Sequence, residues 1–209
     1  MEGSSNLSNC SNKLEHHPVT SDGIVNKRET SQFLIKNPEM RPFKYKDLSQ
    51  EQLNSCRFFS CGNKGIDTFL WHGEGLKFQI DRNKMNEMIM ATPIQVLGYM
   101  AYSMKEATFY VPRHCSPNLF HDIGLKRGDK VLVVHYLGID TSCQGQGLGT
   151  AMIMKVLDFG LRHAKTDPSL RLIVLHATQE ACSFYESLGF HRIGNVNDNL
   201  VEYAYTLTE

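Results

Sequence analysis

The run Gln144-Gly145-Gln146-Gly147-Leu148-Gly149 stands between two patterned stretches of the chain. Residues 131–139 before it are mostly apolar, which predicts a strand, and residues 150–163 after it repeat apolar side chains at helical spacing. A glycine-rich turn that opens a helix leaves backbone N–H groups without helical acceptors, and the positive end of the helix dipole lies behind them. The turn is therefore predicted to bind an anion, with a pyrophosphate as the best fit.

The rest of the chain predicts a mixed α+β fold in which strands and helices alternate over the C-terminal half. The helix after the glycine run carries a broad apolar face, which predicts core packing. Hydrophobic periodicity and Gly or Pro breaks place the other elements. Helices are expected over 48–58, 66–76 and 179–188, strands over 43–46, 87–91, 95–103, 107–111, 170–175, 190–193 and 200–206, and a loop over 112–128.

Composition predicts one domain with a tail. Residues 1–38 are rich in Ser, Asn and charge and lack apolar periodicity, so a flexible tail is expected there and a single domain over 39–209. The 22 basic and 22 acidic residues balance, and the part after the tail is close to neutral as well. This balance argues against a global electrostatic attraction to nucleic acid or membrane and leaves a local patch open.

Cysteine spacing and hydropathy bear on metal binding and on the cellular compartment of the protein. The six cysteines, at 10, 56, 61, 115, 143 and 182, form no Cys-x-x-Cys pair and no zinc-type cluster, so no metal site is expected. Free thiols in a reducing compartment fit this usage. No stretch has the length of a membrane span or the core of a secretion signal. A cytoplasmic protein is expected.

Three phosphate-binding patterns compete for the glycine run. A P-loop requires Gly-x-x-x-x-Gly-Lys-Ser/Thr, and no Lys follows the glycines here. A dinucleotide fingerprint requires Gly-x-Gly-x-x-Gly in the first strand–helix unit and an acidic residue that closes a matching strand about 20 positions later, and neither condition is met. The third pattern, Gln-x-x-Gly-x-Gly, is present as Gln144 to Gly149 and resembles the pyrophosphate motif of the GNAT acetyltransferase superfamily.

A second motif supports this resemblance. The stretch Ala181-Cys-Ser-Phe184-Tyr185-Glu-Ser-Leu-Gly189-Phe190 resembles the Ala-x-x-Phe-Tyr-x-x-x-Gly-Phe segment of the same superfamily. The resemblance extends over about residues 41–207 and implies a single GNAT-like domain. Such a domain has a mostly antiparallel central sheet flanked by helices, with one splayed pair of parallel strands. It also implies acetyl-CoA as cosubstrate, bound in the cleft between those two strands.

The resemblance assigns roles to individual residues. The strand end would bind the pantetheine arm and polarise the thioester carbonyl through its backbone, and the glycine turn would bind the pyrophosphate through its amides. The cofactor-binding residues so implied are Leu137, Gly138, Ile139, Gln144, Gly145, Gln146, Gly147, Leu148, Gly149 and Thr150. Structural alternatives stay open: the glycines could serve close packing of the helix on the sheet.

Three side chains are candidates for proton transfer. Tyr185 matches the family tyrosine that donates a proton to the leaving CoA thiolate, although it could also be a core aromatic residue. His135 and His176 lie on the two strands expected to flank the cleft, and either could accept a proton from an ammonium group near pH 7. Structural core histidines, or a water relay in place of a dedicated base, remain alternatives.

The acceptor is less defined than the cofactor. An N-acetyltransferase acting on a primary amine by direct attack is the main hypothesis. Residues 59–70, Phe-Ser-Cys-Gly-Asn-Lys-Gly-Ile-Asp-Thr-Phe-Leu, resemble the opening of the bacterial GNAT toxins that acetylate aminoacyl-tRNA. That resemblance implies aminoacyl-tRNA and an antitoxin as partners, whereas the neutral charge and the long tail argue against it. A non-catalytic CoA-binding module is a further alternative. The sequence leaves the oligomeric state open, with a homodimer as one option.

Overall fold

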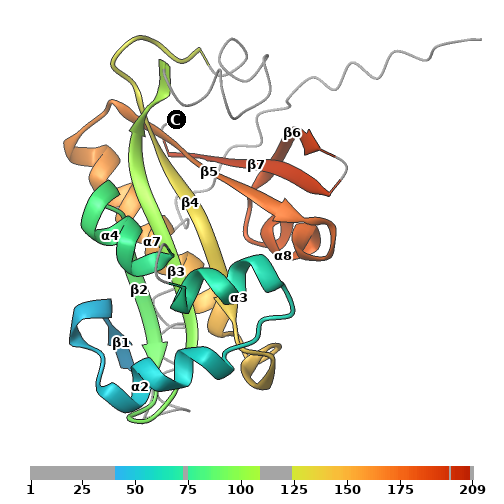
Figure 1. Ribbon diagram of the computed structural model, residues 1–209. Helices are drawn as coiled ribbons and strands as arrows, with labels where there is room; N and C mark the ends of the chain where they lie inside the picture. Colours follow the sequence, from blue (N-terminus) through green and yellow to red (C-terminus); the bar gives the residue numbers. More distant parts are fainter. Residues whose placement is uncertain (1–40, 73–74, 109–123, 198, 208–209) are drawn as a thin grey trace, which may run out of the picture.

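The computed structural model describes residues 41–72, 75–108, 124–197 and 199–207 (Figure 1). The expected tail over residues 1–38 therefore lies outside the described residues, as does most of the expected loop over 112–128. Within the described part of the chain, no helix combines the length and the apolar character that crossing a membrane requires.

The described strands form one seven-stranded sheet in the order β1-β2-β3-β4-β5-β7-β6. Every neighbouring pair is antiparallel except β4 and β5, which run parallel. This arrangement confirms the predicted fold class of a mostly antiparallel sheet with one parallel pair. The strands are β1 (Arg41–Phe43), β2 (Asn86–Ala91), β3 (Val96–Glu106), β4 (Lys130–Ile139), β5 (Leu170–Thr178), β6 (His191–Asn197) and β7 (Leu200–Thr206).

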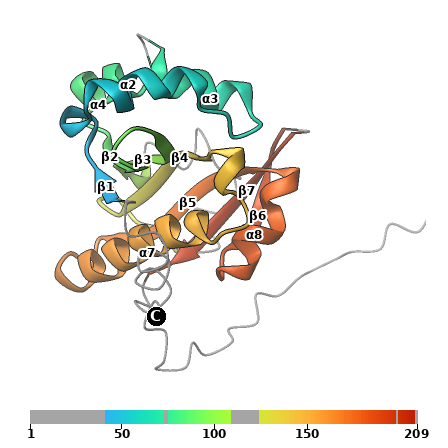
Figure 2. The same ribbon diagram turned by 90° about the horizontal axis from the view of Figure 1, so that it is seen from below.

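Helices cover both faces of the sheet, as Figure 2 shows. On one face lie α7 (Leu148–Thr166) and α8 (Cys182–Ser187). On the other lies a helical layer of α2 (Gln50–Ser55), α3 (Lys64–Trp71) and α4 (Leu76–Asn83), with the 3-10 turns η1 (Tyr45–Asp47) and η2 (Cys56–Phe58). The remaining 3-10 turns, η3 (Thr141–Cys143) and η4 (Gln179–Ala181), follow β4 and β5.

Separate apolar clusters fill the two sides of the sheet. The apolar face predicted for α7 is buried: Met152 and Val156 are each 1% exposed and pack with Leu132 and Ile173 of the sheet. A second cluster lies beneath the helical layer around Tyr99. Strand side chains alternate between faces, so β4 contributes Leu132 and Val134 to the first cluster and Val131 and Val133 to a third one, which also holds Leu172 and Val174 of β5. The central strands are therefore buried on both sides, which explains their almost continuous apolar sequence.

Residues 66–76, expected to form one helix, form parts of two. The first, α3, begins two residues earlier because Asn63 caps it, accepting from the backbone N–H groups of Gly65 and Ile66 at 3.0 and 3.3 Å. The second, α4, was not predicted. A methyl group at position 75 would lie 2.0 Å from the carbonyl oxygen of Phe69, so the chain turns back tightly at Gly75 before α4 begins.

Further elements also differ from expectation. The strand expected over 43–46 is found earlier, as β1 at Arg41–Phe43, and Tyr45–Asp47 form the 3-10 turn η1. The strand expected over 107–111 is absent at its start, where Ala107 and Thr108 are helical, and the remainder lies outside the described residues. The helix expected over 179–188 is η4 followed by the shorter α8. Gly189 follows α8 with a φ of +83°, the left-handed conformation predicted for the helix end.

Candidate active site

The parallel pair β4 and β5 is hydrogen-bonded over only part of its length. Its register runs from Lys130 and Leu170 to Val134 and Leu175 and ends there. Beyond this point β4 stays paired with β3 as far as Ile139, and β5 stays paired with β7 as far as Thr178. The two strands therefore separate while both remain in the sheet, and their facing backbone groups are left without a ladder between them.

A β-bulge in β4 marks the point of separation. Ala101 pairs with Tyr136 and Tyr102 pairs with Val134, so His135 is an extra residue in β4. An extra residue bends its strand and increases the local twist. The bulge directly follows the last β4–β5 pair, at Val134. It therefore accounts for the divergence of the two strands.

The glycine turn lies just beyond the end of β4 and opens α7. Gly145 and Gly147 have φ values of +72° and +88°, a region that other residues rarely adopt. Gly147 is the N-cap of α7, and no side chain caps this helix. The N–H groups of the first helical turn are consequently available to an external acceptor. These features fit the pyrophosphate of acetyl-CoA, because anions bind at helix N-termini through such amides.

The two sequence motifs meet at the start of α7. A methyl group at position 149 would lie 3.4 Å from the ring of Phe184 on α8 and 3.6 Å from the side chain of Ile139 at the end of β4. Both distances are ordinary van der Waals contacts, so a side-chain methyl group would fit at position 149. The packing role that the sequence left open for the glycines is therefore not required at Gly149.

Tyr185 lies on α8 within the apolar cluster on the α7 side of the sheet. Its ring packs edge-on against Phe184 and Phe190, with centroids 4.9 and 5.8 Å away. Burial raises the pKa of Tyr185 above its ordinary value, because the phenolate would lose its hydration. The hydroxyl therefore stays protonated at neutral pH, as a proton donor requires.

His135 and His176 both point to the face of the sheet opposite α7. His176 lies between Leu175 and Ala177, which pack on the α7 side, and alternation directs its ring away from them. Its Nε2 atom lies 3.6 Å from Oε1 of Glu202, a carboxyl group that is only 1% exposed, on β7. The Nε2 atom of His135 lies 2.8 Å from the Oγ atom of Ser103 on β3. The candidate histidines and Tyr185 are thus on opposite faces of the sheet.

A segment from the N-terminal half is hydrogen-bonded to the turn that holds the glycines. The Thr141 N–H donates to the Ser60 carbonyl oxygen at 2.8 Å. The Ser60 N–H donates to Asp140 Oδ2 at 3.2 Å. The Gln144 side-chain amide donates to the carbonyl oxygens of Cys61 and Ile139, both at 3.0 Å. The Gln144 side chain therefore joins this segment to the strand end, in addition to the role predicted for its backbone.

The same segment is braced by Asp67 of α3. Asp67 Oδ1 accepts the Cys61 N–H at 2.7 Å, and its other oxygen lies 3.4 Å from the Ser60 hydroxyl. Burial, reinforced by hydrogen bonding to Asp67, raises the pKa of the Cys61 thiol to about 12. Cys61 is therefore a neutral thiol near pH 7 and a poor nucleophile.

Gly138 of the strand end has a packing role that sequence reasoning missed. A methyl group there would lie 2.8 Å from the Ile66 side chain and 3.2 Å from the rings of Phe59 and Tyr99. Residues 59–66 thus pack directly on the part of β4 that has separated from β5. Asp140 and Asp67 were also missed as bracing residues, although each stands beside a motif that the sequence does show.

The acetyltransferase (GNAT) family profile matches residues 72–190, more than half of the chain. The chain belongs to this family, whose members use acetyl-CoA as cosubstrate. The predicted family, and with it the predicted acetyl-CoA-dependent acetyltransferase, is confirmed. A search of curated proteins finds no match.

Solved structures of bacterial toxins share the fold. A tyrosine-to-phenylalanine variant of the AtaT toxin, bound to the C-terminus of the antitoxin AtaR and acetyl-CoA, has a TM-score of 0.60 and 21% identity over 80% of this chain and 93% of that one. A comparable variant of KacT has a TM-score of 0.61 and 22% identity, over 81% and 95%. AtaT complexed with acetyl-methionyl-tRNAfMet has a TM-score of 0.60 and 20% identity, over 78% and 93%.

Proposed function

We propose that this acetyltransferase transfers the acetyl group of acetyl-CoA to the amino group of aminoacyl-tRNA. The observation that carries the proposal is the hydrogen-bonded attachment of Ser60 and Cys61 to Asp140, Thr141 and Gln144. Those two residues belong to the toxin-like stretch 59–70, and the structure brings that stretch to the end of β4. The similarity to AtaT, which is complexed with acetyl-methionyl-tRNAfMet, supports the same acceptor class.

The glycine turn and the separated end of β4 are the proposed binding elements for acetyl-CoA, which supplies the thioester and its acetyl group. The amides of residues 144–150 are assigned to the pyrophosphate, because Gly145 and Gly147 give the turn its left-handed geometry and α7 is without a side-chain cap. The backbone of Leu137, Gly138 and Ile139 is assigned to the pantetheine arm. Parting of β4 from β5 leaves backbone groups there for that purpose.

We assign to Tyr185 the role of proton donor to the leaving CoA thiolate. Its raised pKa keeps the hydroxyl protonated until that moment. The amine nitrogen forms the new C–N bond as the C–S bond breaks, and the nitrogen releases one proton. That proton is assigned to His176, with Glu202 at 3.6 Å, or His135, with Ser103 at 2.8 Å, directly or through water.

An antitoxin partner is part of the same proposal. The structural neighbours include AtaT bound to the C-terminus of the antitoxin AtaR, and a KacTA–DNA complex. A protein that acetylates aminoacyl-tRNA would arrest translation unless it were restrained. We therefore expect induced expression of this chain alone to stop growth.

The deciding experiment offers labelled acetyl-CoA to the full-length protein with charged tRNA, deacylated tRNA, free amino acids and polyamines in separate reactions. Acid-precipitable label with charged tRNA alone, released as an N-acetylated amino acid on mild alkaline deacylation, is the expected result. Label in free amino acids or polyamines, with none in charged tRNA, would assign a small-amine acceptor instead. Binding of acetyl-CoA without turnover of any amine would indicate a non-catalytic module.

A further inference from the structure

The helical layer carries a net positive charge that the neutral whole chain conceals. Residues 41–86, which form β1, the helical layer and the start of β2, contain eight basic and five acidic residues, whereas residues 87–209 contain ten basic and twelve acidic ones. Charge is thus divided between the two parts of the domain. A polyanion would be attracted to the helical layer rather than to the molecule as a whole.

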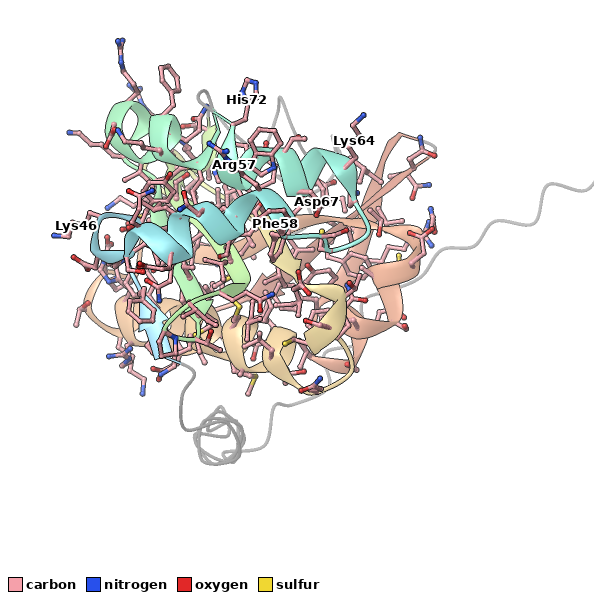
Figure 3. All side chains as sticks on the ribbon, turned by 60° about the horizontal axis from the view of Figure 1, so that its bottom comes forward. Lys46, Arg57, Phe58, Lys64, Asp67 and His72 are labelled. Carbon is pink, nitrogen blue, oxygen red and sulfur yellow. The ribbon has the colours of Figure 1, made fainter. Side chains whose placement is uncertain are left out.

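Five side chains of this layer make up what we term the η2 patch: Arg57, Phe58, Lys64 and His72, with Lys46 farther away at the η1 end of the layer (Figure 3). All five are exposed. Among the described residues, no carboxylate forms an ion pair with Lys46, Arg57 or Lys64. Of the layer's own carboxylates, Asp81 is neutralised by Lys77 at 2.9 Å, whereas Asp67, which accepts from the Cys61 N–H at 2.7 Å, keeps its negative charge. Positive charge prevails in this layer because eight basic residues stand against five acidic ones over residues 41–86.

Phe58 is an exposed aromatic residue whose backbone is held by the turn η2 and by its buried neighbour Phe59. Its side chain is 83% exposed, whereas the next residue, Phe59, is 4% exposed and packs edge-on against Tyr99 with ring centroids 5.7 Å apart. The 3-10 turn η2 thus holds two successive rings in opposite directions, one buried and one in solvent. A ring displayed in this way beside Arg57 can stack on a nucleobase, as aromatic platforms do in proteins that bind single-stranded nucleic acid.

The η2 patch continues into the proposed active site. Phe58 is two residues from Ser60, a separation of at most about 7 Å along an extended chain. Ser60 contacts Asp140 and Thr141 at the end of β4, at 3.2 and 2.8 Å. A strand of nucleic acid that crossed the patch would therefore arrive where β4 and β5 separate. Lys64 follows at the start of α3, so a cation borders the same path, and the carboxylate of Asp67 lies three residues further along the helix.

We infer that the η2 patch binds the RNA part of the acceptor, with Arg57 and Lys64 contacting phosphates and Phe58 stacking on an unpaired base. This inference rests on the proposed function and names the surface that the acceptor uses. Arg57 and Lys64, which form no ion pair within the described part of the chain, and an exposed ring together favour RNA over an acidic protein segment. A peptide carboxylate needs the charges but has no base for the ring.

The test is fluorescence anisotropy of labelled deacylated tRNA with the full-length protein at a series of salt concentrations. The double variant Arg57→Ala with Lys64→Ala should weaken binding on the order of tenfold or more and lower the salt slope by roughly 0.7–0.9 per cation removed. Phe58→Ala should weaken binding about 5- to 150-fold and leave the salt slope unchanged. Each variant's melting curve and acetyl-CoA affinity are measured in parallel and should match the unmodified protein.

Matched controls lie elsewhere on the surface. Lys155→Ala removes an exposed cation from α7, and Ile94→Ala removes an apolar side chain that is 69% exposed between β2 and β3. Both should leave RNA affinity unchanged. Equal losses in controls and patch variants would overturn the inference, as would tighter binding of polyglutamate than of RNA.

The same variants separate failure of the inference from failure of the function. If the protein acetylates charged tRNA and the patch variants keep an unchanged KM for it, the η2 patch is wrong and the function stands. If only small amines are acetylated and no RNA binds, both are wrong. A raised KM with unchanged kcat in the patch variants, and in neither control, is the result expected here.

Discussion

The two halves of β4 differ in their neighbours. The closed half, Lys130–Val134, has β3 on one side and β5 on the other, and Val131 to Val134 are each at most 5% exposed. The open half, residues 135–139, keeps β3 but has no β5 ladder, and four of its five residues are partly exposed. One strand thus combines a stabilising half with a half whose backbone is left for ligands. The bulge at His135 separates the two.

The largest effect is expected for Tyr185 of α8, which is the proton donor proposed for the site at the open half of β4. Tyr185→Phe removes the proposed donor hydroxyl and should lower kcat by about 10²- to 10⁴-fold, the range for lost general acid catalysis. Acetyl-CoA affinity should stay within about twofold, because the phenyl ring keeps its packing. Release of free CoA thiol measures turnover, and calorimetry measures affinity.

Tyr205→Phe is the matched control, since its half-buried ring also packs on Phe190, at 5.5 Å. It should leave kcat unchanged.

In the unmodified protein, the raised pKa of Tyr185 should preserve activity as the pH rises past the ordinary tyrosine value of about 10. Unchanged kcat in Tyr185→Phe would remove this residue from catalysis.

Substitution of a buried residue in the closed half of β4 should lower the stability of the fold. Leu132 is fully buried between the sheet and α7, so Leu132→Ala should lower the free energy of unfolding by about 2–5 kcal/mol. Leu137→Ala in the open half should cost less, because that side chain is partly exposed already. Urea unfolding of the two variants gives the comparison. A larger loss for Leu137→Ala would contradict the division of β4 into two halves.

The turn beyond the open half should respond in both stability and binding. Gly147→Ala places a side chain on a residue with φ +88° and should cost about 1–2 kcal/mol of stability. It should also weaken acetyl-CoA binding measurably by calorimetry. Gly128→Ala is the control, because Gly128 has φ +92° in a turn with open space around it. It should show the same stability loss with full affinity, and a binding loss in both variants would point to global strain.

The smallest effect is expected at the start of the closed half, where Lys130 pairs with Asp167 at 2.7 Å. This hydrogen bond, with that of Ser169, lowers the pKa of Asp167 to about 2. A depressed carboxyl pKa stabilises the fold above the unfolded value near 4, and the stabilisation is lost as the pH falls toward 2. The Tm difference between the unmodified protein and Asp167→Asn should therefore be present at pH 6 and shrink below pH 4. A difference that grew in acid would contradict the assignment.

The elements that could be predicted from sequence are those with a strong local pattern. The strand beginning at Leu200 and ending at Thr206 was placed without error, and the apolar face of α7 was identified from its spacing. The second helix of the N-terminal layer, α4, was missed because its start depends on Gly75 fitting against the backbone of Phe69. That contact is set by folding and leaves no periodic signal in the chain.

The candidate site was predictable in its parts but not in its arrangement. The motifs named the glycine turn and Tyr185, and the adjacency of Gly149 to Phe184 joins them. Spacing alone did not show that His135 and His176 lie on the face opposite Tyr185, since this depends on the bulge and on strand alternation. Nor did it show the η2 patch, because the charge of the whole chain sums to zero.

What the sequence determines by itself is local: glycine at 145 and 147 permits left-handed backbone, and apolar spacing turns one face of α7 to the core. These follow from sterics and periodicity within a few residues. The tertiary structure alone decided that β4 leaves β5 after Val134, and that Ser60 and Cys61 attach to Asp140 and Gln144. Such contacts join residues about 80 positions apart in the chain, and only the packing of the whole domain selects them.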